Sequence, residues 1–346
     1  MSCHRSLKFD LPFPRGLIEH AMPCHFGDPD AETDACQHSA AVFNFSFIIR
    51  LQISGPDADL ALSIFCGRGF SDLPEGGIRY ALHADTDGFL LSDVTVWRTG
   101  TDQFELMTGR PEDPGDLQQI TGRLRAKITD LSDETAVFAV QGPNSEAVLT
   151  AMNNGIKIGA IPYFQFRDMP FWGQIRRIGR LGFTGLPGVE VLCSRPSAAR
   201  LWAGLSSRIR PAGMIAADRV RLSAGLALFN QEFQPPVTAA DAGLLKFRPD
   251  GSTIGDLSRA KVCRVTFSAR ATGSIEPIYW SDGQPFPPQP GILAITSAAR
   301  IQSENTVIGM GYLTTKGEQT KYIEPTGILD NISIIRRFQN NLNRSA

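Results

Sequence analysis

The first residues in this sequence that could do chemistry are an aspartate and a tyrosine placed by a predicted hairpin. An alternating segment, 76–82, and a β-branched and aromatic segment, 88–98, are joined by Asp-Gly turn residues, a pattern typical of a β-hairpin. With the loop centred on residues 86–87, Tyr80 is predicted to face Asp93 across the two strands. A carboxyl group then lies beside a phenol.

The strand face that carries Asp93 is predicted to be largely apolar. Alternate residues of a strand point to one side, so Asp93 shares its face with Leu91, Thr95 and Trp97. A carboxyl group in such surroundings is harder to ionise, which suits a group that holds or exchanges a proton. The alternative interpretation is that Asp93 only marks an edge strand.

A second acid, Glu190, stands alone in a glycine-punctuated segment, 179–193. In the strand that ends this segment, Val189, Val191 and Cys193 form the core face, and Glu190 points the other way. A carboxylate with two acceptor oxygens suits a flat ring that presents adjacent N–H and NH2 donors, as a pterin or guanine does. The alternative is a solvated strand residue.

Histidine and cysteine crowd the beginning of the sequence. The first 38 residues contain Cys3, His4, His20, Cys24, His25, Cys36 and His38. They lack the paired Cys-x2-4-Cys or His-x3-5-His spacing of structural zinc sites, so no metal site is expected. The six scattered cysteines are predicted to be free thiols of a reducing compartment. No histidine follows His83, which argues against Ser-His-Asp and Cys-His catalysis.

The composition is that of an ordinary soluble protein. The chain has 346 residues, 42% of them hydrophobic and 20% charged, and this length favours two or three domains. Its 34 basic and 35 acidic residues give a formal net charge of -1, which favours neither nucleic acid nor a membrane surface as partner. No apolar run approaches the roughly 20 residues that span a bilayer, and a secretory signal is not expected. We therefore expect a cytoplasmic protein.

The elements that must position the two acids repeat one local pattern. A strand runs into Gly55-Pro56 and a helix over 58–65, and a second strand runs into Gly142-Pro143 and a helix over 146–152. Asp57 is placed to cap the first of these helices. The repetition indicates two related α+β lobes with antiparallel sheets.

The rest of the chain gives plainer signals. Residues 1–38 are expected to be irregular, and residues 41–54 to form one extended segment. Helices are expected over 197–207 and 216–224. Short strand candidates then indicate a small all-β module and lie at 262–267, 278–280, 292–297 and 306–313. The polar end, 336–346, is expected to be loose.

Taken together, these segments resemble the aminomethyltransferase family, the T protein of the glycine cleavage system and its relatives, over roughly residues 36–315. The marks of the resemblance keep the family's order and spacing. They are Ala40-Ala41-Val42-Phe43 with Ser46, Ile53-Ser54-Gly55-Pro56-Asp57-Ala58, Arg79-Tyr80-Ala81-Leu82, residues 88–93, Leu131-Ser132-Asp133, Gln141-Gly142-Pro143, Gly182-Phe183-Thr184-Gly185 with Gly188 and Glu190, and Arg221-Leu222 with Ala224-Gly225-Leu226.

The resemblance implies a tetrahydrofolate-binding protein of the α+β class. Two related antiparallel-sheet α+β lobes and a small C-terminal β-barrel or jelly-roll-like domain are expected around a central channel. The implied boundaries are residues 1–50 with 130–235 for the folate-binding domain, residues 51–129 for the second, and residues 250–346 for the third.

The resemblance also implies two catalytic residues. By matching position, Asp93 is similar to the family's catalytic aspartate near N5 and N10 of the folate, and Tyr80 to the tyrosine beside it. A carboxylate there can orient the folate amine and stabilise the positive charge that develops on it.

Four further residues are implied to bind the folate. Glu190 is similar to the glutamate that binds the amidine edge of the pterin, and Phe183 falls where the family usually has a tyrosine that lines the pterin pocket. Arg219 or Arg221 is expected to supply positive charge for the folate's carboxylate tail.

Several positions depart from the family's pattern. Glycine-cleavage members usually have two successive aspartates where this chain has Ser92-Asp93, a version more like the folate-binding domains of sarcosine and dimethylglycine dehydrogenases. Phe47 stands in place of a histidine, Leu186 in place of an acid and Ala217 in place of an arginine.

The expected function is transfer of a one-carbon unit, aminomethyl or methyl, from a small donor or a lipoyl-carrier protein to tetrahydrofolate. One alternative is a non-catalytic folate-binding protein of the iron-sulfur assembly type, whose Lys-Gly-Cys-Tyr-x-Gly-Gln motif is missing at 251–255. The other is the folate-binding subunit of a sarcosine or dimethylglycine oxidase-like complex. Its flavoprotein subunit would be a separate chain, because no Gly-x-Gly-x-x-Gly fingerprint occurs here.

Overall fold

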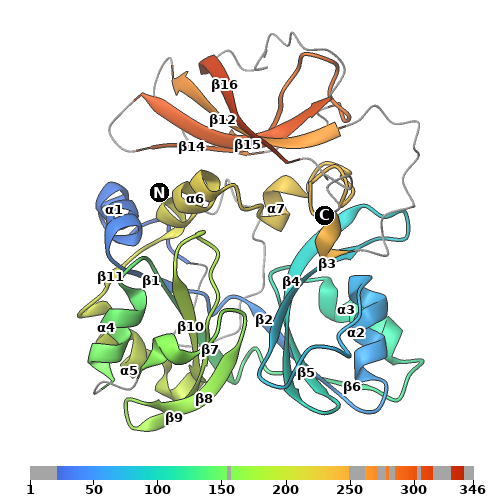
Figure 1. The fold of residues 1–346 in the computed structure, drawn as a ribbon, viewed down its shortest axis with the longest axis vertical. Coiled ribbons are helices and arrows are strands. Elements are labelled where there is room, and N and C mark those ends of the chain that lie inside the picture. Colours follow the sequence, from blue (N-terminus) through green and yellow to red (C-terminus); the bar gives the residue numbers. More distant parts are fainter. Residues whose placement is uncertain are drawn as a thin grey trace, which may run out of the picture. The chain divides into compact units, whose positions relative to one another are not determined.

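The structure is a computed structural model that describes residues 22–153, 157–248, 262–271, 278–279, 285–301, 305–314 and 329–338. Contacts divide the chain into two compact units, whose elements Figure 1 labels. The first unit comprises residues 1–65, 69–80 and 94–224, and the second comprises residues 66–68, 81–93 and 225–346. Within the described residues, no helix has the length and apolar character needed to cross a membrane.

A six-stranded sheet in the order β11-β1-β7-β10-β9-β8 lies in the first unit. Its strands are β1 (Ala41–Asn44), β7 (Thr135–Gln141), β8 (Phe166–Phe171), β9 (Gln174–Gly179), β10 (Gly188–Ser194) and β11 (Arg210–Pro211). Every pair is antiparallel except β1 with β11. Helices α4 (Ser145–Met152) and α5 (Arg195–Ser206) cover one face, where Phe138 and Val191 pack with Leu149 and Leu201 (Figure 1).

A five-stranded sheet has the order β3-β4-β5-β2-β6. Its strands are β2 (Ile49–Ser54), β3 (Ile78–Ala84), β4 (Leu90–Gly100), β5 (Gln103–Thr108) and β6 (Lys127–Asp130). Helices α2 (Ala58–Cys66) and α3 (Asp113–Thr121) lie beside it (Figure 1). The predicted α+β class with antiparallel sheets is confirmed.

The two strand–Gly-Pro–helix units have the same backbone geometry. Gly55 and Gly142 have φ values of 122° and 127°, a region that favours glycine. A Cβ atom would lie 2.4 Å from the Arg125 carbonyl oxygen at Gly55 and 2.5 Å from the Ser39 carbonyl oxygen at Gly142. The predicted repetition is confirmed. Contrary to the capping prediction, the Asp57 carboxylate accepts hydrogen bonds from the backbone N–H and guanidinium of Arg125.

Residues 29–38, expected to be irregular, form helix α1 (Pro29–His38). The Asp28 carboxylate caps this helix by accepting from the N–H groups of Asp30 and Ala31. Pro29 stands in the first turn, where the missing N–H costs nothing. Proline therefore begins a helix here, and the expectation of irregular structure over these residues is wrong.

The segment 41–54, expected to be one extended stretch, is split between the two sheets. Strand β1 pairs with β7, and strand β2 pairs with β5 and β6. A turn separates them, in which the Ile48 N–H donates to the Phe45 carbonyl. A run of β-forming residues does not reveal such a turn, because both strands favour the same residue types.

The second unit contains a sheet in the order β13-β14-β15-β12-β16. Its strands are β12 (Val262–Ala271), β13 (Ile278–Tyr279), β14 (Ala294–Arg300), β15 (Thr306–Thr314) and β16 (Leu329–Phe338). Strand β16 was not predicted, and residues 336–338, expected to be loose, belong to it. Ile332 and Ile334 pack on the core at the period of a strand. Residues 339–346 lie outside the described residues.

Helical elements of the middle of the chain include η2 (Ile158–Ala160), α6 (Met214–Ala224), α7 (Phe229–Glu232) and η3 (Leu245–Phe247). The helices predicted over 58–65, 146–152, 197–207 and 216–224 are confirmed. Arg264 of β12 donates to the carbonyls of Gly225 and Ala242 and stacks on Phe338 at 3.8 Å. These contacts bind residues 225–242 to the C-terminal sheet.

The thiol prediction holds in part. Cys36, Cys66, Cys193 and Cys263 form no disulfide, whereas Cys24 is disulfide-bonded, so the prediction is wrong at that position. Cys3, His4 and His20 lie outside the described residues.

Candidate functional site

Glu190 lies at the centre of a row of paired residues that crosses the six-stranded sheet. Its direct partners are Ala139 on β7 and Gly179 on β9, and the next residues are Phe43 on β1 and Phe166 on β8. Paired residues of antiparallel strands point to one face. The acid therefore stands between two small neighbours, with an aromatic residue beyond each. As predicted, this face is opposite to the one packed on α4 and α5.

Trp97 of β4 closes one side of this row. A Cβ atom at Gly179 would lie 2.1 Å from Cη2 of Trp97, so the ring lies directly over the glycine. The Trp97 and Phe166 ring centroids are 5.3 Å apart. The buried Trp97 also packs with Leu192, two residues after Glu190 on β10. The indole is therefore fixed against the strand that neighbours the acid.

Phenylalanines close the other side. The ring of Phe183 lies edge-on to Phe43 at 5.2 Å and tilted against Phe45 at 4.5 Å. Phe183 keeps partial solvent exposure, as expected of a residue that lines a binding surface. We call Phe43, Phe166, Trp97 and Phe183 the aromatic frame of Glu190.

Burial dominates the environment of the Glu190 carboxyl group. Among the described residues no donor or cation contacts it, and burial raises its pKa to about 7. Arg177, two residues before Gly179 on β9, is engaged elsewhere: its guanidinium pairs with Glu105 at 2.8 Å and with Asp168 at 2.8 Å. A half-buried acid without a donor is one that a ligand with N–H groups can satisfy.

Gln141 holds the loop that leads into β10. Its Oε1 accepts from Thr184 Oγ1 at 3.0 Å, and its Nε2 donates to the Leu181 carbonyl at 3.4 Å. Cβ atoms at Gly182 and Gly188 would lie 2.1 and 2.3 Å from this amide. A side chain at either glycine would therefore displace the buried Gln141 amide that positions the loop.

The predicted hairpin is confirmed, but with a longer loop. The Asp85 N–H donates to the Phe89 carbonyl at 2.9 Å, and the Gly88 N–H donates to the Asp85 carbonyl at 3.1 Å. Gly88 has φ 84°, the geometry of a three-residue loop with a glycine bulge. This loop shifts the pairing next to the turn by one residue and removes the argument that placed Tyr80 opposite Asp93.

Asp93 lies on the less buried face of β4. The buried face carries Leu90, Ser92 and Val94, whereas Asp93 and Thr95 are half-buried. Trp97, on the same face by alternation, is fully buried, so this face is partly shielded from solvent. Tyr80 of β3 is half-buried as well. The two acids belong to different units, with Asp93 in the second and Glu190 in the first, and their convergence on one ligand stays a prediction.

Arg219 and Arg221 lie on α6 and are buried. The Arg219 guanidinium donates to Asp30 at 2.6 Å and to Thr33 at 3.4 Å, both on α1. The Nε of Arg221 donates to Asp218 at 2.7 Å. Each cation thus faces a carboxylate of the chain itself, and a role toward a ligand's tail stays a prediction for both.

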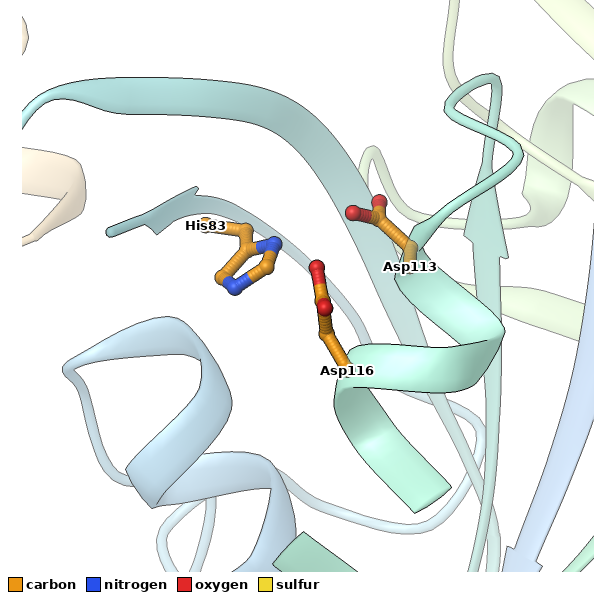
Figure 2. Close-up of side chains that lie close together, drawn as sticks. All are labelled: His83, Asp113 and Asp116. Carbon is orange, nitrogen blue, oxygen red and sulfur yellow. The ribbon is translucent and has the colours of Figure 1, made fainter. Parts of the chain in front are cut away.

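Three side chains elsewhere have the composition of a metal site. Figure 2 shows His83 with Asp113 and Asp116 of α3, and one potential ligand atom of each lies within 4.8 Å of the others. Both carboxylates already accept from the Arg110 guanidinium, at 2.9 and 2.7 Å, and Asp113 also accepts from the Thr108 hydroxyl. Because a guanidinium supplies the positive charge, we assign this cluster to the structure of the α3 turn.

Sequence reasoning missed most of the aromatic frame. It placed Trp97 on the face of Asp93 and gave no role to Phe43 or Phe166. The available signal was local: Gly179 is a glycine within a strand, which marks close approach of another group. That the approaching group is the Trp97 indole depends on how distant strands pair, which the residues around Gly179 do not indicate.

Comparisons with known proteins agree with this architecture. An aminomethyltransferase of Geobacillus sp. is 29% identical over 245 residues, which is 68% of this chain and 67% of that protein. An aminomethyltransferase of Rubrobacter xylanophilus is 30% identical over 226 residues, which is 64% of this chain and 60% of that protein. The chain thus spans about two thirds or less of these relatives.

A solved structure shares the fold. The glycine cleavage system aminomethyltransferase T of Bartonella henselae matches with a TM-score of 0.70 at 23% identity, covering 85% of this chain and 83% of that one. The sequence model of one family matches residues 17–247, which include Glu190 and the whole aromatic frame. The resemblance found in the sequence is confirmed, and the chain belongs to the family described as the GCVT N-terminal domain.

Proposed function

We propose that this chain binds tetrahydrofolate and transfers a one-carbon unit, aminomethyl or methyl, to it from a separate donor. The observation that carries the proposal is the Glu190 carboxyl group, which has no donor among the described residues and stands within the aromatic frame. The pyrimidine half of the reduced pterin ring of tetrahydrofolate is flat and presents adjacent N–H and NH2 donors. Its chemistry fits a carboxylate between aromatic side chains.

Each residue has a distinct task in this proposal. Glu190 orients the ring by accepting two hydrogen bonds, and Phe183 packs on the ring's face. Asp93 orients the reacting amine and stabilises positive charge that develops on it. Tetrahydrofolate supplies the nucleophilic nitrogen when bound. The donor, whether a small methylated amine, a lipoyl-carrier protein or the product of a flavoprotein subunit, is left open by the proposal.

Calorimetric titration with 5-formyltetrahydrofolate, a stable reduced folate, tests the binding. We expect Glu190→Gln to weaken binding about tenfold or more, because a hydrogen bond to a charged group contributes about 1.5–3 kcal/mol. Glu134→Gln, an exposed acid just before β7, is the control and should bind as the unchanged protein does. A chain that does not bind this folate at all would end the proposal.

A second candidate is folate binding without chemistry. The family resemblance implies a histidine at position 47 and an arginine at position 217. Here Phe47 packs on Phe45 at 5.4 Å, and Ala217 is buried in α6. These changes remove polar groups and leave the aromatic frame intact. A screen of methylamines, glycine derivatives and methoxyaromatics as donors separates the two functions, since a pure binder transfers no carbon from any of them.

A further inference from the structure

The surroundings of Glu190 influence whether its side chain is ionised or neutral. Its two paired neighbours, Ala139 and Gly179, have no polar side-chain atoms, and Trp97 covers the second of them. An ionised carboxylate in such a place lacks the donors that would replace its hydration. These surroundings therefore shift the unliganded acid toward its neutral form, compared with a solvated glutamate.

Burial is the one cause of the shift in the Glu190 pKa, and no charged group among the described residues offsets it. The ionisable side chains on β8, β9 and β4 are Arg167, Asp168, Arg176, Arg177, Asp93 and Arg98. Arg177 is paired with Glu105 and Asp168, and Arg98 donates to the carbonyls of Ser71, Leu73 and Thr101. Strands β1 and β7 and residues 181–187 carry no ionisable side chain.

A ring with an N–H group beside an NH2 group presents two donors to one acid. A neutral carboxyl group offers one acceptor oxygen and one O–H, so it can satisfy only one of these donors well. The carboxylate satisfies both, and hydrogen bonds to an ionised acceptor are the stronger kind. Such a ligand therefore favours the ionised acid.

Resting on the proposed function, we propose that the ligand's ring binds to the ionised form of Glu190 and that binding releases a proton to the solvent. The carboxyl O–H bond breaks, its electron pair stays on the oxygen, and the proton passes to the buffer. The ligand keeps both of its protons and donates them as hydrogen bonds. Binding becomes weaker as the pH falls, because the acid must first be ionised.

The size of the effect follows from linkage. Burial raises the pKa of Glu190 to about 7, so about half of the molecules carry the proton at pH 7, and about half a proton is released per ligand bound. Affinity for the ligand falls about tenfold from pH 8 to pH 6. A carboxylate with an ordinary pKa near 4.5 would give no change over this range.

Calorimetry of the full chain with 5-formyltetrahydrofolate measures the proton directly. Titrations at pH 7 in phosphate and in Tris differ in heat by the number of protons released multiplied by the difference in buffer ionisation enthalpy. The formyl group removes the basicity of N5, so the ligand itself does not titrate here. We expect about half a proton per ligand and the tenfold loss of affinity from pH 8 to pH 6.

The outcomes separate the two proposals. Glu190→Gln should bind more weakly, with heats that do not depend on the buffer. Binding by the unchanged protein with no buffer dependence overturns proton release and leaves the proposed function standing. Absence of binding at both pH 8 and pH 6 overturns the proposed function and, with it, the proposal of proton release. Glu134→Gln should release the same fraction of a proton as the unchanged protein.

Discussion

The indole of Trp97 occupies the space that a side chain at Gly179 would need. An added Cβ atom would lie 2.1 Å from Cη2 and 2.7 Å from Cζ3 of the ring. Gly179 is the direct partner of Glu190 across the sheet. The glycine therefore lets a strand of the five-stranded sheet bring an aromatic ring beside the acid of the six-stranded sheet.

Replacement of this glycine should destabilise the first unit. We expect Gly179→Ala to lower the free energy of unfolding by about 1–3 kcal/mol, since overpacking forces a buried ring or strand to move. Urea unfolding followed by tryptophan fluorescence measures the change. Gly115→Ala, in α3 with nothing within 4 Å of the added atom, is the matched control and should be neutral or slightly stabilising. Equal effects of both would show that the ring does not constrain the strand.

Glu105 of β5 is predicted to hold β2 and β9 together within the first unit. Its carboxylate pairs with Arg50 at 2.6 Å and with Arg177 at 2.8 Å, and its side chain is 5% exposed. Glu105→Gln leaves two guanidinium groups without a buried counter-charge, and we expect a loss of about 3–5 kcal/mol in the free energy of unfolding.

The control for this prediction is the outer member of the same network. Asp168 pairs with Arg177 at 2.8 Å but is 49% exposed. Because exposed pairs contribute up to about 1 kcal/mol, Asp168→Asn should change stability little. Thermal unfolding of both variants checks the contrast. If the two variants unfold at the same temperature, burial does not increase the contribution of the Glu105 ion pairs to stability.

Local signals in the sequence were sufficient for much of the fold. Gly55 and Gly142 marked two turns that accept only glycine, and both strand–turn–helix units are present. Alternation along β10 placed Glu190 on the correct face. These features depend on residues a few positions apart, where steric limits on the backbone act directly.

The pairing of distant segments could not be predicted in the same way. The loop after Asp85 has three residues rather than two. Gly88 adopts the positive φ of the longer loop, but a glycine at this position is compatible with either loop length. Phe43 and Phe166 lie in the row of Glu190 only through the register of strands far apart in the chain. A register shift of one would place every side chain on the opposite face, and no local pattern fixes it.

Glu190 should make the stability of the unliganded protein depend on pH. Its folded-state pKa, raised to about 7 by burial, lies above the ordinary value of an unfolded glutamate. Between the two values the folded chain binds more protons than the unfolded one, so this acid lowers stability as the pH rises from about 4.5 to about 7. Above that range the destabilisation is fully present.

Glu190→Gln removes this cost. We expect the variant to melt at least about 2 °C higher than the unchanged protein at pH 8 and at nearly the same temperature at pH 4.5, where both side chains are neutral. Differential scanning calorimetry without ligand makes the comparison. Glu134→Gln should show no such difference between the two pH values. A Glu190→Gln variant that is less stable at pH 8 would contradict a half-buried carboxylate that lacks a donor among the described residues.

Asp93 is the residue whose chemistry the proposed transfer depends on. Asp93→Asn keeps the size of the side chain and removes its negative charge, so binding of 5-formyltetrahydrofolate should change by no more than about threefold. Transfer to tetrahydrofolate from a donor found in the screen should fall about 100-fold or more, the range of a lost acid–base or charge-stabilising group. Asp87→Asn, in the exposed turn of the same hairpin, should leave both quantities unchanged. Full transfer activity in Asp93→Asn with folate binding intact would remove Asp93 from the reaction and leave Glu190 as the one acid with a defined part in the site.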